Sequence, residues 1–318
     1  RDDAYANLVR EQFEYNLTRM VVLADDAGVP ILFVTPPSNL RDCSPFKSEP
    51  REGLSEDAYA QFRSDLNRAR TFINEGKLPD ALTALDDCLN IDDGYAEAHF
   101  LRGRIFWKRG EYENARSSFE RARDEDVCPL RATGPLLATI DQVVSKEIAN
   151  AIDFESMIGD LSEHGIPGND WFLDHVHPTI EGNRRLSLSI VERLIDTGVA
   201  TPVASWNAEA IASVKTRVES QLDAVEHGRA LLTVAQVYLW GGKFEEARTA
   251  ADRALAMAPE DWMPYYVLAS LAHMTGNLDE AIEWQRQAVE LNREYELLRR
   301  QLEELETMRE MAESGGEM

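Results

Sequence analysis

The chain has 318 residues, with 33 Lys and Arg against 57 Asp and Glu, which gives a formal charge of −24 at pH 7. This charge repels phosphate backbones and anionic membranes, so we expect no nucleic-acid partner. No apolar run approaches the roughly 20 residues that span a bilayer, and the length indicates two or three domains. The cysteines Cys43, Cys88 and Cys128 are too few and too scattered for a disulfide framework or a metal cluster. We therefore expect a soluble, multidomain protein without a metal or cofactor.

The first segment, residues 1–50, is predicted to form a helix followed by a strand. Apolar residues recur at helical spacing between Tyr5 and Val21, and Gly28-Val29-Pro30 is expected to end the helix. The run Ile31–Thr35 is short and apolar, which is typical of a buried parallel strand.

The loop after this strand begins with two prolines. A loop at the carboxyl end of a parallel strand faces the crevice in which open α/β sheets bind ligands. Asn39 and Arg41 are therefore candidate substrate contacts, and Ser38 is a candidate nucleophile, although it is better interpreted as the end of the strand.

A 34-residue repeat is the clearest organisation in the chain. Small and aromatic residues of the segment near 62–128 recur with this spacing, since Ala69, Phe72, Ala81 and Leu85 are followed by Gly103, Phe106, Ala115 and Phe119. A second pair lies near 228–295, where Ala235, Ala247 and Ala254 recur as Ala269, Ala281 and Ala288. Small residues allow the two helices of a hairpin to approach closely, and aromatic residues fill the space between hairpins.

This pattern resembles the tetratricopeptide repeat. The resemblance implies four antiparallel helix hairpins in two separated pairs, which bind or position a protein or peptide partner. Gln285 and Arg293 depart from the pattern, because they replace a large apolar residue and a proline. The charged, Leu-rich segment from Tyr295 to Glu310 is predicted to be a capping helix.

The segment 128–200 is predicted to complete the α/β part begun by residues 1–50. It contains a helix at Leu136–Ile148, a strand at Ala149–Asp153, a loop with Gly165, and a helix that includes Leu186–Leu194. This order of elements is that of the tail of a doubly wound sheet, with the first repeat pair inserted between its strands. We expect the two strands to be parallel neighbours.

Chemistry is concentrated in the run Trp171-Phe-Leu-Asp174-His175-Val-His177-Pro178. Pro178 is expected to open the helix that follows. On one tight turn, Asp174 can orient the imidazole of His177 and stabilise its protonated form, which makes the pair an orienter and a general base.

The spacing Asp-x-x-His-Pro resembles the last sequence block of the SGNH (GDSL-type) esterase and lipase family. The order of elements is also similar to the second half of that fold, which has a flavodoxin-like sheet. The resemblance implies a serine esterase or acyl transferase acting on an ester substrate, in which His177 removes the proton of a serine. The family's Gly-Asp-Ser block is absent, since Gly159-Asp160-Leu161-Ser162 lacks Ser after Asp. We therefore expect a fragment that is inactive alone, with its nucleophile upstream.

Several alternatives remain open from the sequence. Asp174 and His177 are also suited to capping the following helix. His175 and His177 form a His-x-His pair that could ligate a metal with Asp174, but a third ligand is hard to place. At the level of function, the alternative to an esterase is a non-catalytic repeat scaffold with a degenerate hydrolase domain.

The predicted fold class is α/β, as a partial doubly wound sheet, combined with all-α repeat hairpins. The predicted segments are an α/β part at 1–50, an inserted repeat pair at 57–127, a second α/β part at 128–200, and a repeat pair with its capping helix at 205–312.

Overall fold

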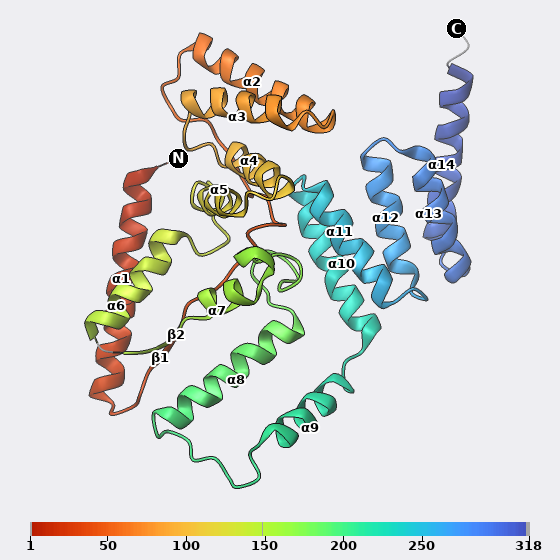
Figure 1. Cartoon of the computed structure of the whole chain (residues 1–318). Coiled ribbons are helices and arrows are strands. Elements are labelled where there is room, and N and C mark those ends of the chain that lie inside the picture. Colours follow the sequence, from red (N-terminus) through yellow and green to blue (C-terminus); the bar gives the residue numbers. More distant parts are fainter. Residues whose placement is uncertain (1, 148, 316–318) are drawn as a thin grey trace. The chain divides into compact units, whose positions relative to one another are not determined.

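The computed structural model describes residues 2–147 and 149–315. The chain forms two compact units, of which the first ends at Ala200 and the second begins at Thr201. Figure 1 shows mainly helices in both units, with one small sheet in the first. Within the described ranges, no helix is both long and apolar enough to cross a membrane.

The first unit combines a two-stranded sheet with helices before, between and after its strands. Its helices are α1 (Asp3–Asp26), α2 (Glu56–Asn74), α3 (Leu78–Ile91), α4 (Ala96–Lys108), α5 (Tyr112–Asp124), α6 (Gly134–Glu147), α7 (Phe154–Leu161) and α8 (Ile180–Asp196). Its strands are β1 (Leu32–Val34) and β2 (Asn150–Ile152), and a short 3-10 turn spans Glu163–Gly165.

The two strands pair in parallel, with Leu32 opposite Asn150 and Val34 opposite Ile152. This confirms the prediction that the apolar runs at 31–35 and 149–153 are parallel neighbours, although each strand has only three residues. Side chains alternate between the two faces of the sheet. Phe33 packs with α1 and α6, whereas the side chains of Leu32 and Val34 pack with α7 and α8.

The doubly wound sheet expected from the sequence is not formed by the described residues. They contain only β1 and β2, with helices packed on both faces, and no further strand extends this sheet there. The unit consists mostly of helix because the inserted segment between β1 and β2 is helical. The predicted helix at 136–148 ends on Ile148, which lies outside the described residues.

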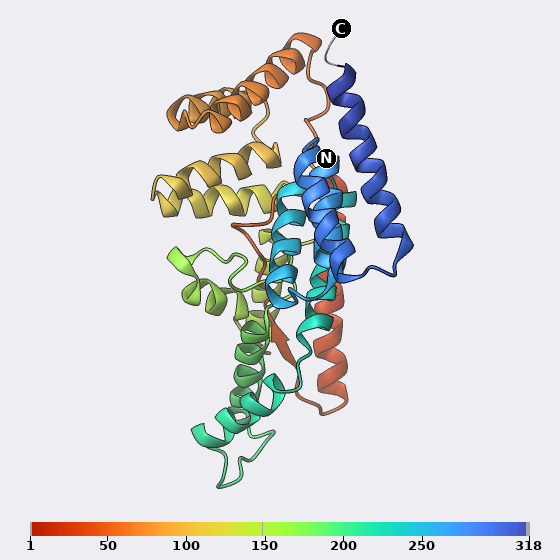
Figure 2. The same ribbon diagram turned by 90° about the vertical axis from the view of Figure 1, so that its right-hand side faces the viewer.

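The inserted segment forms two helix hairpins, α2 with α3 and α4 with α5, which Figure 2 shows stacked one on the other. Close approach in the second hairpin depends on a glycine in α4. A Cβ at Gly103 would lie 2.7 Å from the ring of Phe119, which is buried in α5. The small residue predicted at this repeat position is therefore required by the packing of an aromatic residue against it.

The second unit contains only helices among its described residues. They are α9 (Ala208–Glu219), α10 (Ala224–Trp240), α11 (Phe244–Met257), α12 (Trp262–Met274), α13 (Leu278–Leu291) and α14 (Glu296–Gly315). Hairpins form from α10 with α11 and from α12 with α13, and α14 packs on α13 through the buried Leu298 and Leu305. The predicted capping helix is therefore present, although its Leu face is buried.

Gln285 stands where the repeat pattern predicts a large apolar residue, and it is buried in α13. Its Nε2 donates a hydrogen bond of 2.8 Å to the carbonyl oxygen of Leu298 in α14. A buried amide is tolerated when it is hydrogen-bonded. The departure from the pattern therefore joins the last hairpin to the capping helix.

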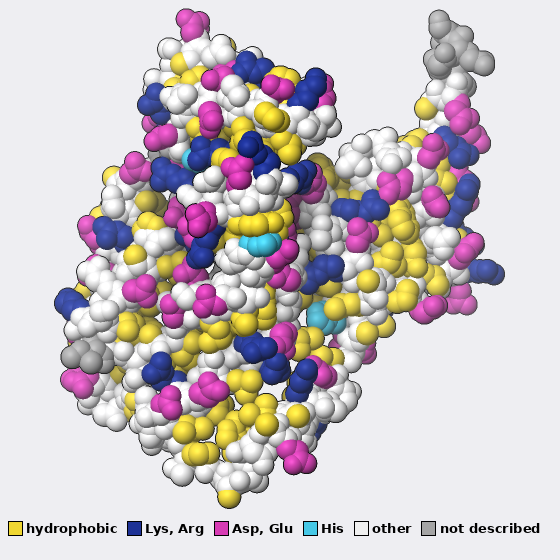
Figure 3. Space-filling model, viewed as in Figure 1, with side chains coloured by type: hydrophobic (Ala, Val, Ile, Leu, Met, Phe, Trp, Pro, Cys, Tyr) yellow, Lys and Arg dark blue, Asp and Glu magenta, His cyan; other side chains and the backbone are white. Residues whose placement is uncertain are grey.

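The negative charge is not gathered in one place on the face drawn in Figure 3. Acidic and basic side chains alternate there with hydrophobic ones. The finer division into four segments at 1–50, 57–127, 128–200 and 205–312 stays a prediction.

Candidate functional site

The turn that carries Asp174 and His177 is closed by backbone hydrogen bonds on both sides. The N–H of Leu173 donates to the carbonyl of His177 at 2.8 Å, and the N–H of Thr179 donates to the carbonyl of Trp171 at 2.8 Å. Phe172, which is fully buried, anchors the turn against β2 and α7. The turn is thus held by the apolar run that precedes it in the sequence.

The carboxylate of Asp174 is the centre of this turn. Its Oδ1 accepts the backbone N–H groups of Val176 and His177 at 2.8 Å each, and its Oδ2 lies 2.7 Å from Nδ1 of His177. Burial raises the pKa of Asp174, but the hydrogen bonds from His177 and Val176 together lower it by more. The pKa of Asp174 therefore lies below its ordinary value. Asp174 therefore remains a carboxylate at neutral pH.

This geometry selects one tautomer of His177. A carboxylate accepts only from a protonated nitrogen, so Nδ1 carries the hydrogen and Nε2 is free to accept a proton. The side chain of His177 is 73% exposed, whereas that of Asp174 is 10% exposed. The prediction that the two groups lie on one turn within hydrogen-bond reach is confirmed.

The structure also tests the alternative that Asp174 and His177 cap the helix that follows them. Helix α8 begins at Ile180, and its N-cap is Thr179, whose Oγ1 accepts the N–H of Gly182 at 3.3 Å. Asp174 is therefore not the cap of α8. Pro178 does not open the helix either, because it precedes the cap and pairs with Phe172 in an isolated antiparallel bridge.

His175 differs from His177 in its surroundings. Its side chain is largely buried, and its ring packs edge-on to that of Phe46 with centroids 5.0 Å apart. The described residues contain no group of three His, Cys, Asp or Glu side chains placed to hold a metal ion. The exposed His177 is thus the histidine of this turn that can meet a reactant.

Asn39 lies beneath the turn and is buried. Its Nδ2 donates to the carbonyl of Asp174 at 3.2 Å and to Oδ1 of Asn169 at 2.9 Å, and its backbone N–H donates to the carbonyl of His175. These bonds join the loop after β1 to the turn. They favour a positioning role for Asn39 over the substrate contact expected from the sequence, because its side chain is occupied and covered.

Arg41 joins the inserted hairpins to the loops of the sheet. Its Nη2 lies 2.8 Å from Oδ1 of Asp170, and its guanidinium stacks on the ring of Trp107 in α4, with Cζ 4.9 Å from the centroid. Burial lowers the pKa of Arg41, but Asp42, Asp170 and Glu163 raise it by more, so the side chain stays charged. These contacts also favour positioning over substrate binding.

Two residues that the sequence analysis missed support the same loop. The buried Arg131 donates from Nη1 to the carbonyls of Asn39 and Cys43, at 2.8 and 2.9 Å. The buried carboxylate of Asp126 accepts the backbone N–H groups of Phe46 and Lys47. Both lie where the repeat insertion returns to the sheet. Their partners are about 80 to 90 positions away, so no local sequence signal marks these contacts.

Ser38, the alternative nucleophile, is buried. It lines a cavity of about 10 Å³ together with Glu155 and Arg116, and His177 does not line that cavity. These surroundings favour the structural interpretation of Ser38.

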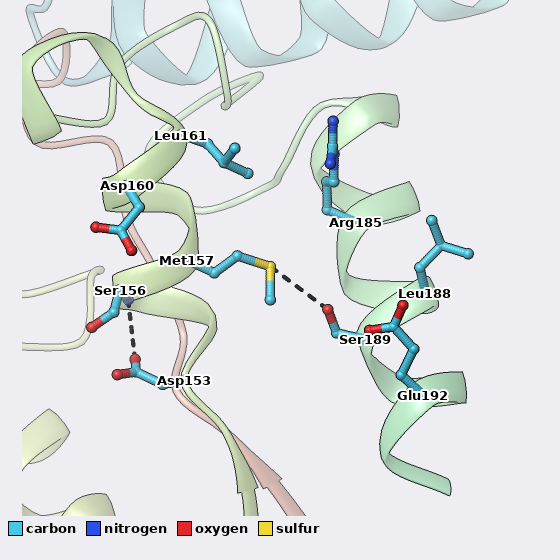
Figure 4. Close-up of a pocket in the computed structure, with 9 residues that line it drawn as sticks. All are labelled: Asp153, Ser156, Met157, Asp160, Leu161, Arg185, Leu188, Ser189 and Glu192. Carbon is cyan, nitrogen blue, oxygen red and sulfur yellow. Dashed lines mark hydrogen bonds between the residues drawn. The ribbon is translucent and has the colours of Figure 1, made fainter. Parts of the chain in front are cut away.

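The first unit also has a larger cavity, of about 520 Å³, between α7 and α8. Figure 4 shows Met157 of α7 and Ser189 of α8 pointing toward each other, and the Sδ of Met157 accepts from the Ser189 hydroxyl at 3.6 Å. Neither Asp174 nor His177 lines this cavity. It is therefore a feature separate from the Asp-His turn.

Comparison with known proteins decides what the hairpins are. Residues 66–126 and 232–296 match the family model described as tetratricopeptide repeat. The chain contains tetratricopeptide repeats. The matched segments contain α3 to α5 and α11 to α13 whole, together with the C-terminal parts of α2 and α10, so the repeat prediction is confirmed. No curated protein matches the chain.

Among solved structures, several repeat proteins are similar to the chain at low identity. YrrB, described as a TPR protein with an unusual peptide-binding site, is 15% identical, with 74% of this chain and 88% of YrrB covered at a TM-score of 0.22. TTC0263 of Thermus thermophilus is 16% identical, with 77% of this chain and 98% of TTC0263 covered at a TM-score of 0.24. The TPR2AB domain of yeast Sti1, solved in a complex with pHSP90, is 13% identical. The comparison covers 80% of this chain and 86% of the Sti1 chain at a TM-score of 0.27.

Proposed function

We propose that this chain is a scaffold whose tetratricopeptide repeats bind a protein or peptide partner. The observation that carries the proposal is the pair of matched segments, one in each unit, each folded as two stacked helix hairpins. Stacked hairpins present an extended surface formed by helices of successive repeats, which suits an elongated ligand better than a small molecule.

A selection from random peptides tests this proposal. The full chain is immobilised and exposed to a phage-displayed library of random dodecapeptides, with heat-denatured chain as the control. We expect peptides that bind the folded chain and not the denatured one. Recovery of the same peptides from both surfaces, or of none, would contradict a peptide-binding role.

A second function is favoured by one specific observation, the 2.7 Å contact between Asp174 and His177 with the His177 side chain exposed. We propose that this pair is the orienter and general base of an SGNH-type site that acts on ester bonds. A base without a nucleophile cannot form an acyl-enzyme, because the members of such a triad act as a unit. The 318 residues contain no Gly-Asp-Ser, so the proposal requires a serine outside them.

An ester assay separates the two functions. The chain as given is expected to show no turnover of a short-chain p-nitrophenyl ester above that of its His177→Ala variant. A longer form of the protein that supplies a Gly-Asp-Ser block is expected to hydrolyse the ester and to lose most of that activity on His177→Ala. Equal activity of this longer form with and without the substitution would show that Asp174 and His177 are structural.

A further inference from the structure

Three exposed apolar side chains recur in the second unit at the repeat spacing of 34 residues. They are Trp240 at the end of α10, Met274 at the end of α12 and Met308 in α14. Their exposures are 86%, 56% and 44%. Single exposed apolar residues are common on protein surfaces, whereas contiguous exposed ones mark interaction sites. We call these three residues the apolar row.

The row follows one face of the stacked helices. Equivalent positions of successive repeats lie on the same side of the stack, and α10 packs on α12. Helix α14 continues this series, because Nε2 of Gln301 reaches the hydroxyl of Tyr266 in α12 at 3.5 Å. Packed helices are about 8 to 10 Å apart, which is the interval expected between Trp240 and Met274.

A pocket of about 160 Å³ lies beside the row, between α12 and α14. Met308 and the buried Leu305 supply its apolar part, and Ser270 and Glu304 supply oxygen atoms. The side-chain oxygen of Gln301 is buried in this wall without a hydrogen-bond partner. This acceptor has capacity for one donor, which a ligand side chain can supply.

The pocket has a negative character that it shares with the whole unit. Residues 201–318 contain 11 Lys and Arg against 21 Asp and Glu, a formal charge of −10. Glu304 has one ion pair, with Arg300 at 3.7 Å, and both side chains are more than half exposed. Such an exposed pair contributes little, so a ligand cation can replace Arg300 at low cost.

From these observations we infer that the apolar row binds an extended peptide that has an apolar residue at every third position and an Arg or Lys side chain in the pocket at Glu304. In the polyproline II conformation three residues make one turn and span about 9 Å, so every third side chain lies on the same side at about the spacing of the helices. The methylene groups of the basic side chain would pack on Leu305 and Met308, and its donors would reach Glu304 and Gln301. This inference rests on the proposed peptide-binding function and names the ligand class.

The peptides selected from the random dodecapeptide library provide the test. We expect them to be enriched in apolar residues three positions apart and in one basic residue. Their dissociation constants are then measured by fluorescence anisotropy with the full chain. Trp240→Ala and Met274→Ala should each weaken binding about tenfold, because buried aromatic and Met anchors carry much of the affinity. Glu304→Gln should weaken the binding of peptides that contain the basic residue. It should leave unchanged the dissociation constants of peptides in which Ala replaces that residue.

Matched controls lie on the same helices or hairpins. Met257→Ala removes a Met that is 38% exposed in α11, outside the row, and Glu303→Gln removes the neighbouring exposed charge of α14. Both should bind as the wild type does. If selected peptides bind the folded chain but are insensitive to Trp240, Met274 and Glu304, the row is not the binding surface, although peptide binding stands. If no peptide is selected, the proposed function fails together with this inference.

Discussion

At the scale of single residues, Asp174 is the group on which the geometry of the turn depends most. Its carboxylate accepts two backbone N–H groups and the ring of His177 while itself buried. A group whose pKa is lowered in the folded state stabilises the protein above its unfolded pKa, which is about 3.9 for Asp. That stability is lost as the pH falls through the lowered pKa.

We predict that Asp174→Asn destabilises the first unit by about 1 to 3 kcal/mol at pH 7, because an amide cannot accept all three hydrogen bonds. The difference between variant and wild type should shrink as the pH falls below about 3.9, the unfolded pKa of Asp, and through the lowered pKa of Asp174. Urea unfolding at several pH values measures both effects. The control is Asp160→Asn, an exposed carboxylate of α7. A difference that stays constant with pH would contradict the role assigned to the charge of Asp174.

A second residue-scale prediction concerns Asn39. Its replacement by Ala leaves the carbonyl of Asp174 and the side-chain oxygen of Asn169 without their buried donor. We expect a loss of about 1 to 3 kcal/mol in the free energy of unfolding. Asn114→Ala, on the exposed face of α5, should change stability by less than about 0.5 kcal/mol. If Asn39→Ala unfolds at the same urea concentration as the wild type, these hydrogen bonds do not hold the turn.

At the scale of elements, the repeat hairpins depend on close helix contacts. We predict that Gly103→Val destabilises the α4–α5 hairpin by about 2 to 3 kcal/mol, because its side chain would overlap the buried ring of Phe119. Ser117→Val places the same side chain on the exposed surface of α5 and should be nearly neutral. Thermal unfolding followed by circular dichroism compares the two variants. A stable Gly103→Val variant would show that Phe119 can move aside.

The sequence predicts elements well where local periodicity is strong. The 34-residue spacing locates all four hairpins, and two short apolar runs locate β1 and β2, because both signals depend only on nearby residues. The start of α8 is predicted less well. Asp174 and Pro178 resemble helix-start residues, and only the three-dimensional structure shows that Thr179 provides the cap.

The candidate site shows the same division between local and distant information. The Asp174–His177 contact spans three residues and follows from the motif, whereas the positioning of the turn by Asn39 spans 135 residues and does not. The apolar row of Trp240, Met274 and Met308 had a signal in the sequence, since its members share the repeat spacing. Their exposure is a property of the fold, and it distinguishes this row from the many buried apolar positions of the repeats.

At the scale of the whole molecule, the chain divides into two units at residue 200. We predict that the two units unfold independently, since each has its own buried core. Leu298→Ala should lower the melting temperature of the second unit alone, and Phe154→Ala should lower that of the first alone. Each substitution removes a buried side chain and should reduce the free energy of unfolding of its unit by about 2 to 5 kcal/mol. Calorimetry resolves the transitions. A single transition that shifts with either variant would show that the units are coupled.

The insertion of two hairpins between β1 and β2 has a consequence for synthesis on the ribosome. Leu32 and its partner Asn150 are 118 positions apart, so at 5 to 20 residues per second the first strand is made about 6 to 24 s before the second. The two helices of each hairpin are adjacent in the sequence and pack on each other, so each hairpin can fold during that interval. The nascent chain therefore exposes an unpaired apolar strand, flanked by structured repeats, until the second strand emerges. A chaperone that binds extended apolar segments would act at this stage, and residues 31–35 are the segment at which we expect to find it.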